Sequence, residues 1–240
     1  MLHPADFFDL GDESVAIFFA ECDLVWQAIR HIGRHVSRLV GTKQLISGEV
    51  MPGAHIGDRP VYIGKNAVVE PGAYIHGPAY IGDGAVVRHG AFVRENVILM
   101  PGSVLGHASE AKNSLFLPGA HAPHFNYVGD SILGHQVNLG AGTKLSNLGI
   151  LSRKDRATGK RPTIIITIDN HEYNTGLTKM GAIMGDGAQT GCNAVLNPGC
   201  LVGQQTLVYA NLSLRKGYHP AQSIIKLRQS IRRISKVSRR

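Results

Sequence analysis

Two cations and a run of polar side chains are the residues of this sequence best suited to chemistry. Arg94 and Lys112 are 18 positions apart, and the stretch 122–147, APHFNYVGDSILGHQVNLGAGTKLSN, adds histidine, tyrosine and asparagine. Two stacked cations repel each other unless an anion lies between or near them. Arginine and lysine suit a phosphate, whereas a solvated pair of surface cations costs little. The spacing alone leaves both interpretations open.

These residues lie within a repeat of six residues. Nine of eleven positions spaced by six from residue 63 are Ile, Val or Leu. The position four residues after each of the first eight, here called the small position, carries a small residue in all eight cases. The two sets are Ile63, Val69, Ile75, Ile81, Val87, Val93, Leu99, Leu105, Ala111, Leu117 and Pro123, and Ala67, Ala73, Ala79, Ala85, Ala91, Val97, Ser103 and Ser109. A second array runs from Met184 to Leu214. This period predicts a parallel β-helix with coils of about 18 residues.

The repeat is disturbed inside the stretch 122–147 and just before it. The small position fails at Leu115, His121 and Tyr127, and Val128 follows Pro123 by five residues instead of six. Places where a local rule fails are candidate functional sites. The disturbance therefore directs attention to this part of the coil.

Three other segments depart from the repeat. Residues 12–40 have apolar residues at helical spacing, and the strands PTIIITID and HEYNTGL predict a hairpin inserted between Leu148 and Gly181. Ile224, Leu227, Ile231 and Ile234 share one helical face, which predicts a basic C-terminal helix. We expect a mainly β chain with an N-terminal helical segment (1–44), a β-helix (45–214, insertion about 149–182) and a basic tail (215–240).

Charge and cysteine content narrow the class of protein. The net charge is +8, yet residues 215–240 hold nine Lys or Arg and no Asp or Glu, so the remaining 16 basic and 17 acidic residues nearly cancel. We therefore expect no nucleic-acid partner. Three cysteines without a CxxC pair favour a reducing compartment. The acidic start MLHPADFFDLGDE is not a signal peptide and no apolar run reaches membrane-spanning length, so we expect a cytoplasmic protein.

Several motifs carry a resemblance to a known family. They are PHFNYVGD (123–130), VNLGAGT (137–143), SNL (146–148), TGLTKMGAIMGD (175–186) and LNPG (196–199), after Arg94 and Lys112. Over about residues 45–214 the chain resembles the acetyltransferase half of the bifunctional enzymes that acetylate glucosamine-1-phosphate and then uridylylate it. The resemblance extends to variants with an inserted hairpin and to short single-domain relatives. It implies a left-handed coil, a homotrimer with sites between subunits, and acetyl-CoA as co-substrate.

The resemblance also implies roles for individual residues. It implies that His124 is the general base and that Asn147 lies beside the reacting amine. It implies that Arg94 and Lys112 bind the sugar phosphate, and that Tyr127 and Asn138 contact the substrate. The residues implied to line the acetyl-CoA groove are Ala141, Cys192 and Ala210. Cys192 replaces a residue that is usually serine or small. The family's cation after the asparagine has no certain match, and Arg153 and Arg156 are its candidates.

These residue types suit the transfer of acetyl to an amine. The amine loses a proton as it attacks the thioester, and a histidine with a pKa of about 6.5 accepts that proton at neutral pH. A backbone N–H in the GAG turn can stabilise the oxyanion. No metal is required for this step.

Other functions stay open at this stage. The acceptor could be another, nucleotide-linked amino-sugar, or the chain could be a non-catalytic β-helix that binds a sugar phosphate. The other histidines could suggest zinc, as in the γ-type carbonic anhydrases, but we find no matching zinc pattern. About 44 residues before the repeat are too few for a nucleotidyltransferase domain. If the parent pathway needs that step, a separate nucleotidyltransferase must supply it.

Overall fold

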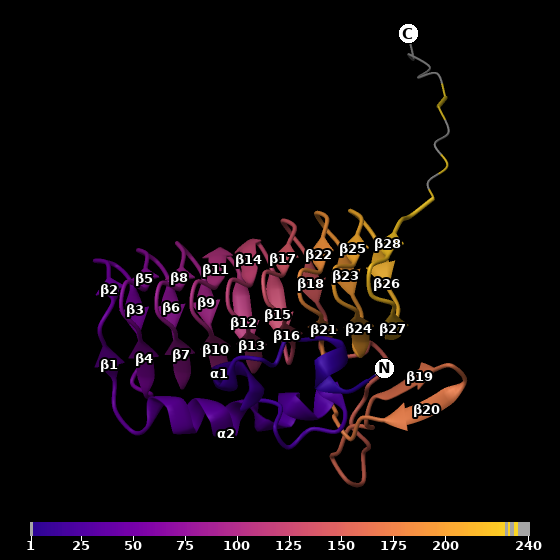
Figure 1. Ribbon diagram of the computed structural model, residues 1–240, viewed down its shortest axis with the longest axis horizontal. Coiled ribbons are helices and arrows are strands. Elements are labelled where there is room, and N and C mark those ends of the chain that lie inside the picture. Colours follow the sequence, from indigo (N-terminus) through magenta and orange to yellow (C-terminus); the bar gives the residue numbers. More distant parts are fainter. Residues whose placement is uncertain (1, 229, 231–232, 235–240) are drawn as a thin grey trace.

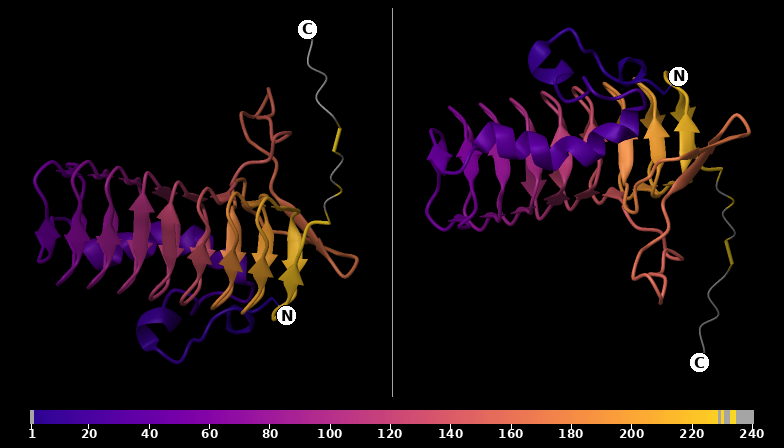
Figure 2. Two further views of the ribbon diagram at one scale, coloured as in Figure 1. Left: turned by 90° about the horizontal axis from the view of Figure 1, so that it is seen from above. Right: turned by 90° about the horizontal axis from the view of Figure 1, so that it is seen from below.

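The chain winds into a β-helix of short parallel strands (Figure 1). The computed structural model describes residues 2–228, 230 and 233–234. A helical N-terminal segment lies along one side of the coil, and an antiparallel hairpin projects near the C-terminal coils (Figure 2). The mainly β solenoid predicted from the six-residue period is thus confirmed. Its left-handed winding stays an expectation from the resemblance.

Three parallel sheets form the sides of the coil. The first sheet consists of β1 (Leu45–Ile46), β4 (Val61–Ile63), β7 (Ala79–Ile81), β10 (Val97–Leu99), β13 (Ser114–Phe116), β16 (Ile132–Leu133), β21 (Ala182–Met184), β24 (Cys200–Val202) and β27 (Gly217–His219). The second consists of β2 (Glu49–Val50), β5 (Val68–Val69), β8 (Val86–Val87), β11 (Val104–His107), β14 (His121–His124), β17 (Asn138–Leu139), β22 (Gln189–Thr190), β25 (Leu207–Val208) and β28 (Ile224–Ile225). The third consists of β3 (His55–Ile56), β6 (Tyr74–Ile75), β9 (Phe92–Val93), β12 (Glu110–Lys112), β15 (Tyr127–Gly129), β18 (Lys144–Leu145), β23 (Val195–Leu196) and β26 (Ser213–Leu214).

The interior of the coil is filled by the repeated aliphatic and small residues. Every aliphatic position from Ile63 to Ala111 has no exposed surface, and the small positions from Ala67 to Ser109 are equally buried. Each strand contributes one aliphatic side chain to a narrow core, and the small residue sits inside at the corner. The period of six therefore reflects the length of one side and one corner of the coil.

The register after Ala111 differs from the sequence-based prediction. Leu99 pairs with Phe116 and Leu105 pairs with Ala122, so these two residues occupy the interior instead of Leu117 and Pro123. One side of the coil, between Ala111 and Phe116, is one residue shorter than the others. It contains Asn113, whose φ of 44° gives a tighter corner. A second short side precedes Leu133, which pairs with Phe116 17 residues earlier. Coils in this region therefore have 17 residues instead of 18.

The N-terminal segment covers the outer face of the first sheet. Its elements are η1 (Pro4–Asp6), α1 (Glu13–Ala16), η2 (Val25–Gln27) and α2 (Ala28–Val40). Helix α2 buries Ile29, Ile32 and Val36 in a second apolar cluster with Ile98 and Leu115 of the sheet. The predicted amphipathic helix is confirmed, and Figure 2 shows it running across successive strands of the first sheet. Both faces are therefore buried at strands such as β10 and β13, whereas β1 at the sheet edge is exposed.

The insertion leaves the coil after β18 and returns at β21. Its strands β19 (Ile165–Ile168) and β20 (His171–Asn174) pair antiparallel, which confirms the predicted hairpin. Tyr173 meets the ring of Trp26 edge-on at 5.9 Å between centroids, so the hairpin leans on the N-terminal segment. Leu145 pairs directly with Leu196 across the insertion point. The stacking of coils is therefore continuous despite the long excursion.

The C-terminal end differs from the expected helix. Ile224 and Ile225 form β28, and Leu207 and Val208 are their partners in the coil below. Ile225 packs against the interior core, so the coil extends past residue 214. Residues 226–228 are not helical, and Ile231 lies outside the described residues. Strand stacking replaces the predicted amphipathic helix because Ile225 continues an interior column of the β-helix. No helix in the described ranges is long and apolar enough to cross a membrane.

Asp186 joins the N-terminal segment to the coil. Its carboxylate accepts a hydrogen bond from the Asp9 N–H at 2.7 Å and one from the His135 N–H at 2.7 Å. The same carboxylate lies 3.0 Å from His135 Nδ1, and the Asp186 N–H donates to the Phe7 carbonyl at 2.9 Å. The hydrogen bond that the His135 ring donates to Asp186 raises the pKa of His135, although burial opposes this shift.

We expect the folded state to lose stability as the pH rises above the ordinary histidine pKa of about 6.5. Because the folded pKa of His135 is raised, its contribution is complete below the ordinary value of about 6.5 and is lost as the pH rises through the folded value. Thermal melts of wild type and His135→Asn across this range measure it, since 1 kcal/mol shifts the Tm by about 2–4 °C in chains of this size. Equal pH dependence in both proteins would contradict the prediction.

Candidate active site

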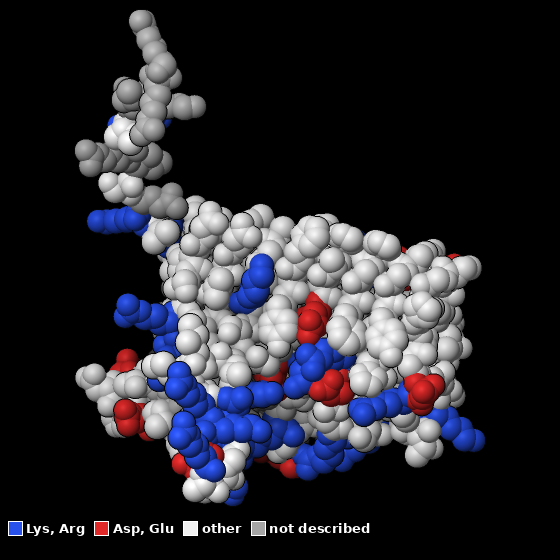
Figure 3. Space-filling view, turned by 180° about the vertical axis from the view of Figure 1, so that it is seen from behind, with Lys and Arg blue, Asp and Glu red and all other residues white. Residues whose placement is uncertain are grey.

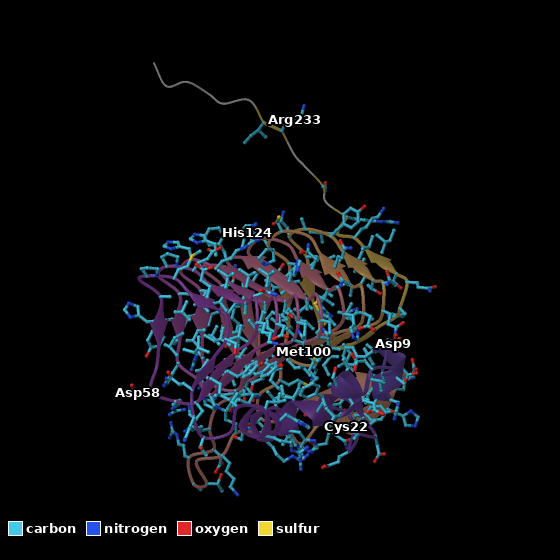
Figure 4. The ribbon with its side chains drawn as sticks, turned by 60° about the vertical axis from the view of Figure 1, so that its left-hand side comes forward. Asp9, Cys22, Asp58, Met100, His124 and Arg233 are labelled. Atoms are coloured by element: carbon cyan, nitrogen blue, oxygen red, sulfur yellow. The ribbon has the colours of Figure 1, made fainter. Side chains whose placement is uncertain are left out.

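His124 lies at the corner where the chain turns from the second sheet to the third. Its side chain is exposed, and Figure 4 shows it at the rim of the coil, away from Cys22 of the N-terminal segment. The next residue, Phe125, is 55% exposed and has a φ of 52°. Its ring meets the ring of His107 edge-on, with centroids 5.1 Å apart. A large aromatic side chain rarely adopts this left-handed backbone, and such residues concentrate at functional sites.

Asn126 holds this corner from inside the coil. It is 3% exposed, and its Oδ1 accepts a hydrogen bond from the His124 N–H at 3.0 Å. Its Nδ2 donates to the carbonyls of Gly140 at 2.9 Å and Thr143 at 3.4 Å in the next coil. Asn126 thus occupies the interior corner position that a small residue fills elsewhere. It ties the backbone of His124 to the GAG turn.

The three residues expected in an acetyl-CoA groove stand in line with His124. Hydrogen bonds run from the Gly142 N–H to the His124 carbonyl, from the Asn193 N–H to the Ala141 carbonyl and from the Asn211 N–H to the Cys192 carbonyl. His124, Ala141, Cys192 and Ala210 therefore occupy the same corner in successive coils. The side chains of Ala141, Cys192 and Ala210 are small and at least partly exposed, so they form a strip of small residues in line with His124. Within the described part of the chain, the Ala141 N–H donates to no acceptor.

Arg94 and Lys112 are neighbours on the third sheet, as their spacing predicts. The Arg94 N–H donates to the Ala111 carbonyl at 2.9 Å, which sets the two cations at equivalent positions in adjacent coils. Arg94 pairs with Glu110 at 2.9 Å, while Glu95 lies 3.6 Å from Arg94 and 3.5 Å from Lys112. The hydrogen bond to Glu110 raises the pKa of Arg94 further. The repulsion between the two cations is therefore relieved by two carboxylates.

Tyr127 and Asn147 converge on the same sheet. A Cβ atom at Gly129 would lie 2.7 Å from both the Tyr127 hydroxyl oxygen and Asn147 Nδ2, so only glycine fits between them. Asn147 donates to the buried carboxylate of Asp130 at 2.5 Å, and Asn113 donates to it at 2.8 Å. Burial is the main cause that raises the pKa of Tyr127, with the charge of Glu110 adding to it. Tyr127 therefore stays a neutral hydroxyl donor.

The predicted residues form two groups in one chain. His124 and the strip of small residues occupy the corner, and Asn138 is exposed on the adjoining second sheet, where it pairs with His121. Arg94, Lys112, Tyr127 and Asn147 face outward from the third sheet or its far corner. The chain thus sets the two groups on different sides of the coil.

A cation that the sequence analysis missed lies beside the third-sheet group. A hollow of about 410 Å³ is lined by Lys179 together with Asn113, Asp130 and Arg30. Arg153 and Arg156 do not line this hollow and form no ion pair within the described residues. Their assignment as the missing family cation stays a prediction, and Lys179 is better placed.

The histidines of the second sheet form a stack. His89 and His107 lie parallel, with ring centroids 5.4 Å apart, and His107 is paired with His124. The Nδ1 atoms of His89 and His107 are each near a backbone carbonyl, at 2.6 and 2.9 Å. Among the described residues, no group of three or more His, Cys, Asp or Glu side chains is arranged to hold a metal ion.

Glu95, Glu110, Phe125 and Asp130 are site residues that sequence reasoning did not select. A 17-residue coil aligns Asn113, Asp130 and Asn147, so recognition of the shorter coil would have revealed that ladder. The carboxylates beside Arg94 and Lys112 carry no such signal. The Arg94–Glu110 and Lys112–Glu95 pairs join neighbouring coils, so they are defined only by the register.

We expect Phe125→Gly to be more stable than Phe125→Ala. Both changes remove the ring, but alanine keeps the left-handed penalty of roughly 1–2 kcal/mol, which exceeds the extra entropy cost of glycine, roughly 0.5–1 kcal/mol. Urea unfolding of both variants measures the difference. Phe92 in β9 supplies the matched control, because there alanine should be the more stable replacement. The same order at both positions would show that the corner is not strained.

Asn126→Ala should destabilise the chain by roughly 1–3 kcal/mol, because it leaves the His124 N–H without its acceptor and removes the side-chain link to the Gly140 and Thr143 carbonyls. The exposed Asn138→Ala serves as control and should change the free energy of unfolding by less than about 0.5 kcal/mol. Denaturant titration followed by circular dichroism measures both. A similar small effect in the two variants would remove Asn126 as the support of the His124 corner.

Comparison with known proteins supports the same class of fold. The family described as bacterial transferase hexapeptide (six repeats) matches residues 60–95. A bifunctional sugar-1-phosphate nucleotidylyltransferase/acetyltransferase from Sulfurisphaera tokodaii is 34% identical over 100 residues, which cover 42% of this chain and 23% of that protein. The bifunctional protein GlmU of Methanococcus maripaludis strain C7 is 33% identical over 104 residues, or 43% and 23% of the two chains. The matches thus span about a quarter of the relatives' length.

Solved structures also resemble part of the chain. The acetyltransferase domain of PglB from Neisseria gonorrhoeae is 24% identical, covers 50% of this chain and 57% of its own, and has a TM-score of 0.33. The UDP-N-acetylglucosamine acyltransferase of Francisella novicida is 16% identical, with coverages of 68% and 58% and a TM-score of 0.33. The internal period of six and the three stacked parallel sheets agree with the repeat model that matches residues 60–95.

Proposed function

We propose that the chain transfers acetyl from acetyl-CoA to the amine of an amino-sugar 1-phosphate, with glucosamine-1-phosphate as the acceptor. The observation that carries this proposal is the line of residues formed by His124, Ala141, Cys192 and Ala210. An exposed imidazole beside a strip of small residues offers a base next to a track for an extended cofactor. The partial match to a protein named as a nucleotidylyltransferase/acetyltransferase supports the same reaction class.

The corner has the groups that acetyl transfer requires. The amine nitrogen forms a bond to the thioester carbonyl carbon, and the carbon–sulfur bond breaks. His124 accepts the proton that the amine loses and returns it to the departing thiolate, so the products are the N-acetyl sugar phosphate and free CoA. The unbonded Ala141 N–H is a donor for the oxyanion of the tetrahedral intermediate. Asn126 fixes the corner that presents both groups.

The third-sheet group would bind the acceptor. Arg94 and Lys112 would receive its phosphate, and the neutral Tyr127 hydroxyl and Asn147 would bind the sugar close to the amine. Because Glu95 and Glu110 already pair with the cations, a phosphate must displace or share these contacts. Asn138 would reach the acceptor from the second sheet.

We further propose a homotrimer whose sites lie between neighbouring copies. The two groups of site residues lie on different sides of one coil, so a cleft between copies can set the corner of one against the third sheet of the next. The unpaired cysteines Cys22, Cys192 and Cys200 support a cytoplasmic location. A separate nucleotidyltransferase stays a predicted partner.

The test of the reaction is release of free CoA from acetyl-CoA and glucosamine-1-phosphate. His124→Ala should lower kcat by about 10²- to 10⁴-fold, the range typical for loss of a general base. His107→Ala is a matched control, because His107 holds the same corner position one coil earlier, and its turnover should stay within threefold of wild type. The exposed Cys192 thiol requires a blank without acceptor.

Each outcome of this assay has one meaning. Equal loss in both variants would assign the effect to the histidine stack instead of the base. If wild type turns over and His124→Ala does so equally well, the proposed reaction would stand and the role of His124 as general base would be rejected. Absence of turnover with glucosamine-1-phosphate and with a panel of free and nucleotide-linked amino-sugars would favour a non-catalytic sugar-phosphate protein.

Removing the competing carboxylate should improve phosphate binding. We expect Glu110→Gln to lower the KM for glucosamine-1-phosphate by about 3- to 10-fold, because it releases Arg94 from a charge-assisted hydrogen bond. Lys112→Ala should raise that KM by a similar factor. Neither change should alter the KM for acetyl-CoA. Initial rates at varied acceptor concentration check this, and an increased KM in Glu110→Gln would mean that Glu110 itself contacts the sugar.

A further inference from the structure

A cavity of about 890 Å³ lies between the insertion and the last coils, apart from the His124 corner. One wall comes from the insertion and the other from the third-sheet edge of the coil. Its lining residues are Gly149, Leu151, Ser152, Pro162, Thr163, Ile164, Ile165, Asn197, Pro198, Ser213, Arg215 and Lys216. This volume is within the usual range for small-molecule sites, about 300–1,000 Å³.

The cavity combines an apolar wall with an unpaired positive end. Leu151 is 88% exposed and Ile165 40% exposed, so apolar surface faces solvent there. Arg215 and Lys216 form no ion pair within the described residues, and the lining contains no Asp or Glu. Figure 3 shows Lys and Arg gathered over the end of the molecule that carries the insertion. This contrasts with Arg94 and Lys112, whose charges are already balanced.

Asn197 supplies a fixed polar group between the two ends. Its Nδ2 donates to Ser213 Oγ at 3.0 Å and to the Leu214 carbonyl at 2.6 Å. These bonds orient the carboxamide, and its oxygen accepts no hydrogen bond from the described residues. The Asn197 carboxamide oxygen, held in this orientation, can accept a hydrogen bond from a donor group on a ligand's ring or ribose.

The coil does not need the insertion that builds this wall. Leu145 pairs with Leu196 and Leu196 with Leu214, so the strands stack without a gap across the insertion point. Ile164 and the Pro162–Thr163 segment line the cavity without joining a coil strand. A wall that the scaffold does not require, facing two unpaired cations, points to a ligand.

We propose that this cavity binds a nucleoside phosphate. The base would lie against Leu151, Ile164 and Pro198, Asn197 would accept a hydrogen bond, and Arg215 and Lys216 would bind the phosphates. A nucleoside phosphate combines the planar apolar ring, the donors and the negative charge that these three parts of the cavity match. Two sources share this chemistry: a nucleotide that is separate from the acetyl donor, and the nucleotide portion of CoA.

The cavity lies on the same side of the coil as the proposed acceptor group. Lys112, Gly129, Ser146 and Asn197 occupy equivalent positions in successive coils, so Asn197 is three strand steps from Lys112. At strand spacings of roughly 4.8 Å, this separation is about 14 Å. The nucleotide site is thus separate from the Arg94–Lys112 pair. The inference does not depend on acetyl transfer.

Direct binding to the full chain tests the proposal. Isothermal titration with UDP, GDP, ADP and CoA, with uridine and inorganic phosphate as part ligands, measures affinity for wild type and for Arg215→Ala/Lys216→Ala. The double variant should weaken nucleotide binding at least tenfold. The control is Arg59→Ala/Lys65→Ala, which removes two exposed cations at the opposite end of the coil and should change affinity less than twofold. Ile164→Ser should weaken the nucleotide and leave inorganic phosphate unchanged.

The pattern across ligands assigns the source. Binding of UDP, GDP or ADP that is lost in the double variant supports a separate nucleotide site, and loss confined to CoA assigns the cavity to the nucleotide end of the acetyl donor. Equal weakening in the two double variants would reduce the effect to net charge and overturn the proposal. No nucleotide or CoA binding to wild type at millimolar concentration, or binding indifferent to both double variants, would also overturn it.

Discussion

Hydrogen bonding between successive coils is the constraint on which the rest of the structure depends. Backbone N–H groups of the coil donate to carbonyls of the adjacent coil, so residues of the β-helix are held beside their counterparts one coil away. Side chains distant in sequence therefore form columns on the outside of the molecule. The histidine corner, the Arg94–Lys112 pair and the Asn113–Asp130–Asn147 ladder are all such columns. The length of a coil decides which side chains share a column, and therefore which functional groups lie side by side.

One corner of the coil carries His124 and departs from the pattern of the others. A corner must reverse direction within few residues, which requires left-handed backbone at Asn113, Phe125 and Asp130. Glycine, asparagine or aspartate meets this need at low cost. Phe125 does not, and it follows His124 directly. The interior Asn126 replaces a small residue at the same corner and links it to the next turn. The ring contact of Phe125 and the hydrogen bonds of Asn126 thus both hold the corner that carries His124.

Electrostatics separates the two positively charged regions of the surface. Arg94 and Lys112 each pair with a carboxylate, so their charges are largely balanced. Arg215 and Lys216 face an apolar wall without such partners. At Arg94 and Lys112, an incoming anion would have to replace a carboxylate. At Arg215 and Lys216, the apolar wall favours binding of an anion that also has an apolar part. The insertion makes this difference, because it contributes the apolar wall and adds no acid to it.

The sequence by itself determined the solenoid, the hairpin and the N-terminal helix. The six-residue period, the alternating run PTIIITID and the helical spacing over 12–40 each depend on local geometry, so they are readable without tertiary contacts. The stacking of Arg94 on Lys112 followed from the same arithmetic. Only the tertiary structure decided the register after Ala111, the strand at Ile224–Ile225 and the carboxylates beside the cations. These depend on how tightly a corner closes and on which side chains meet across coils, and a spacing along the chain contains neither quantity.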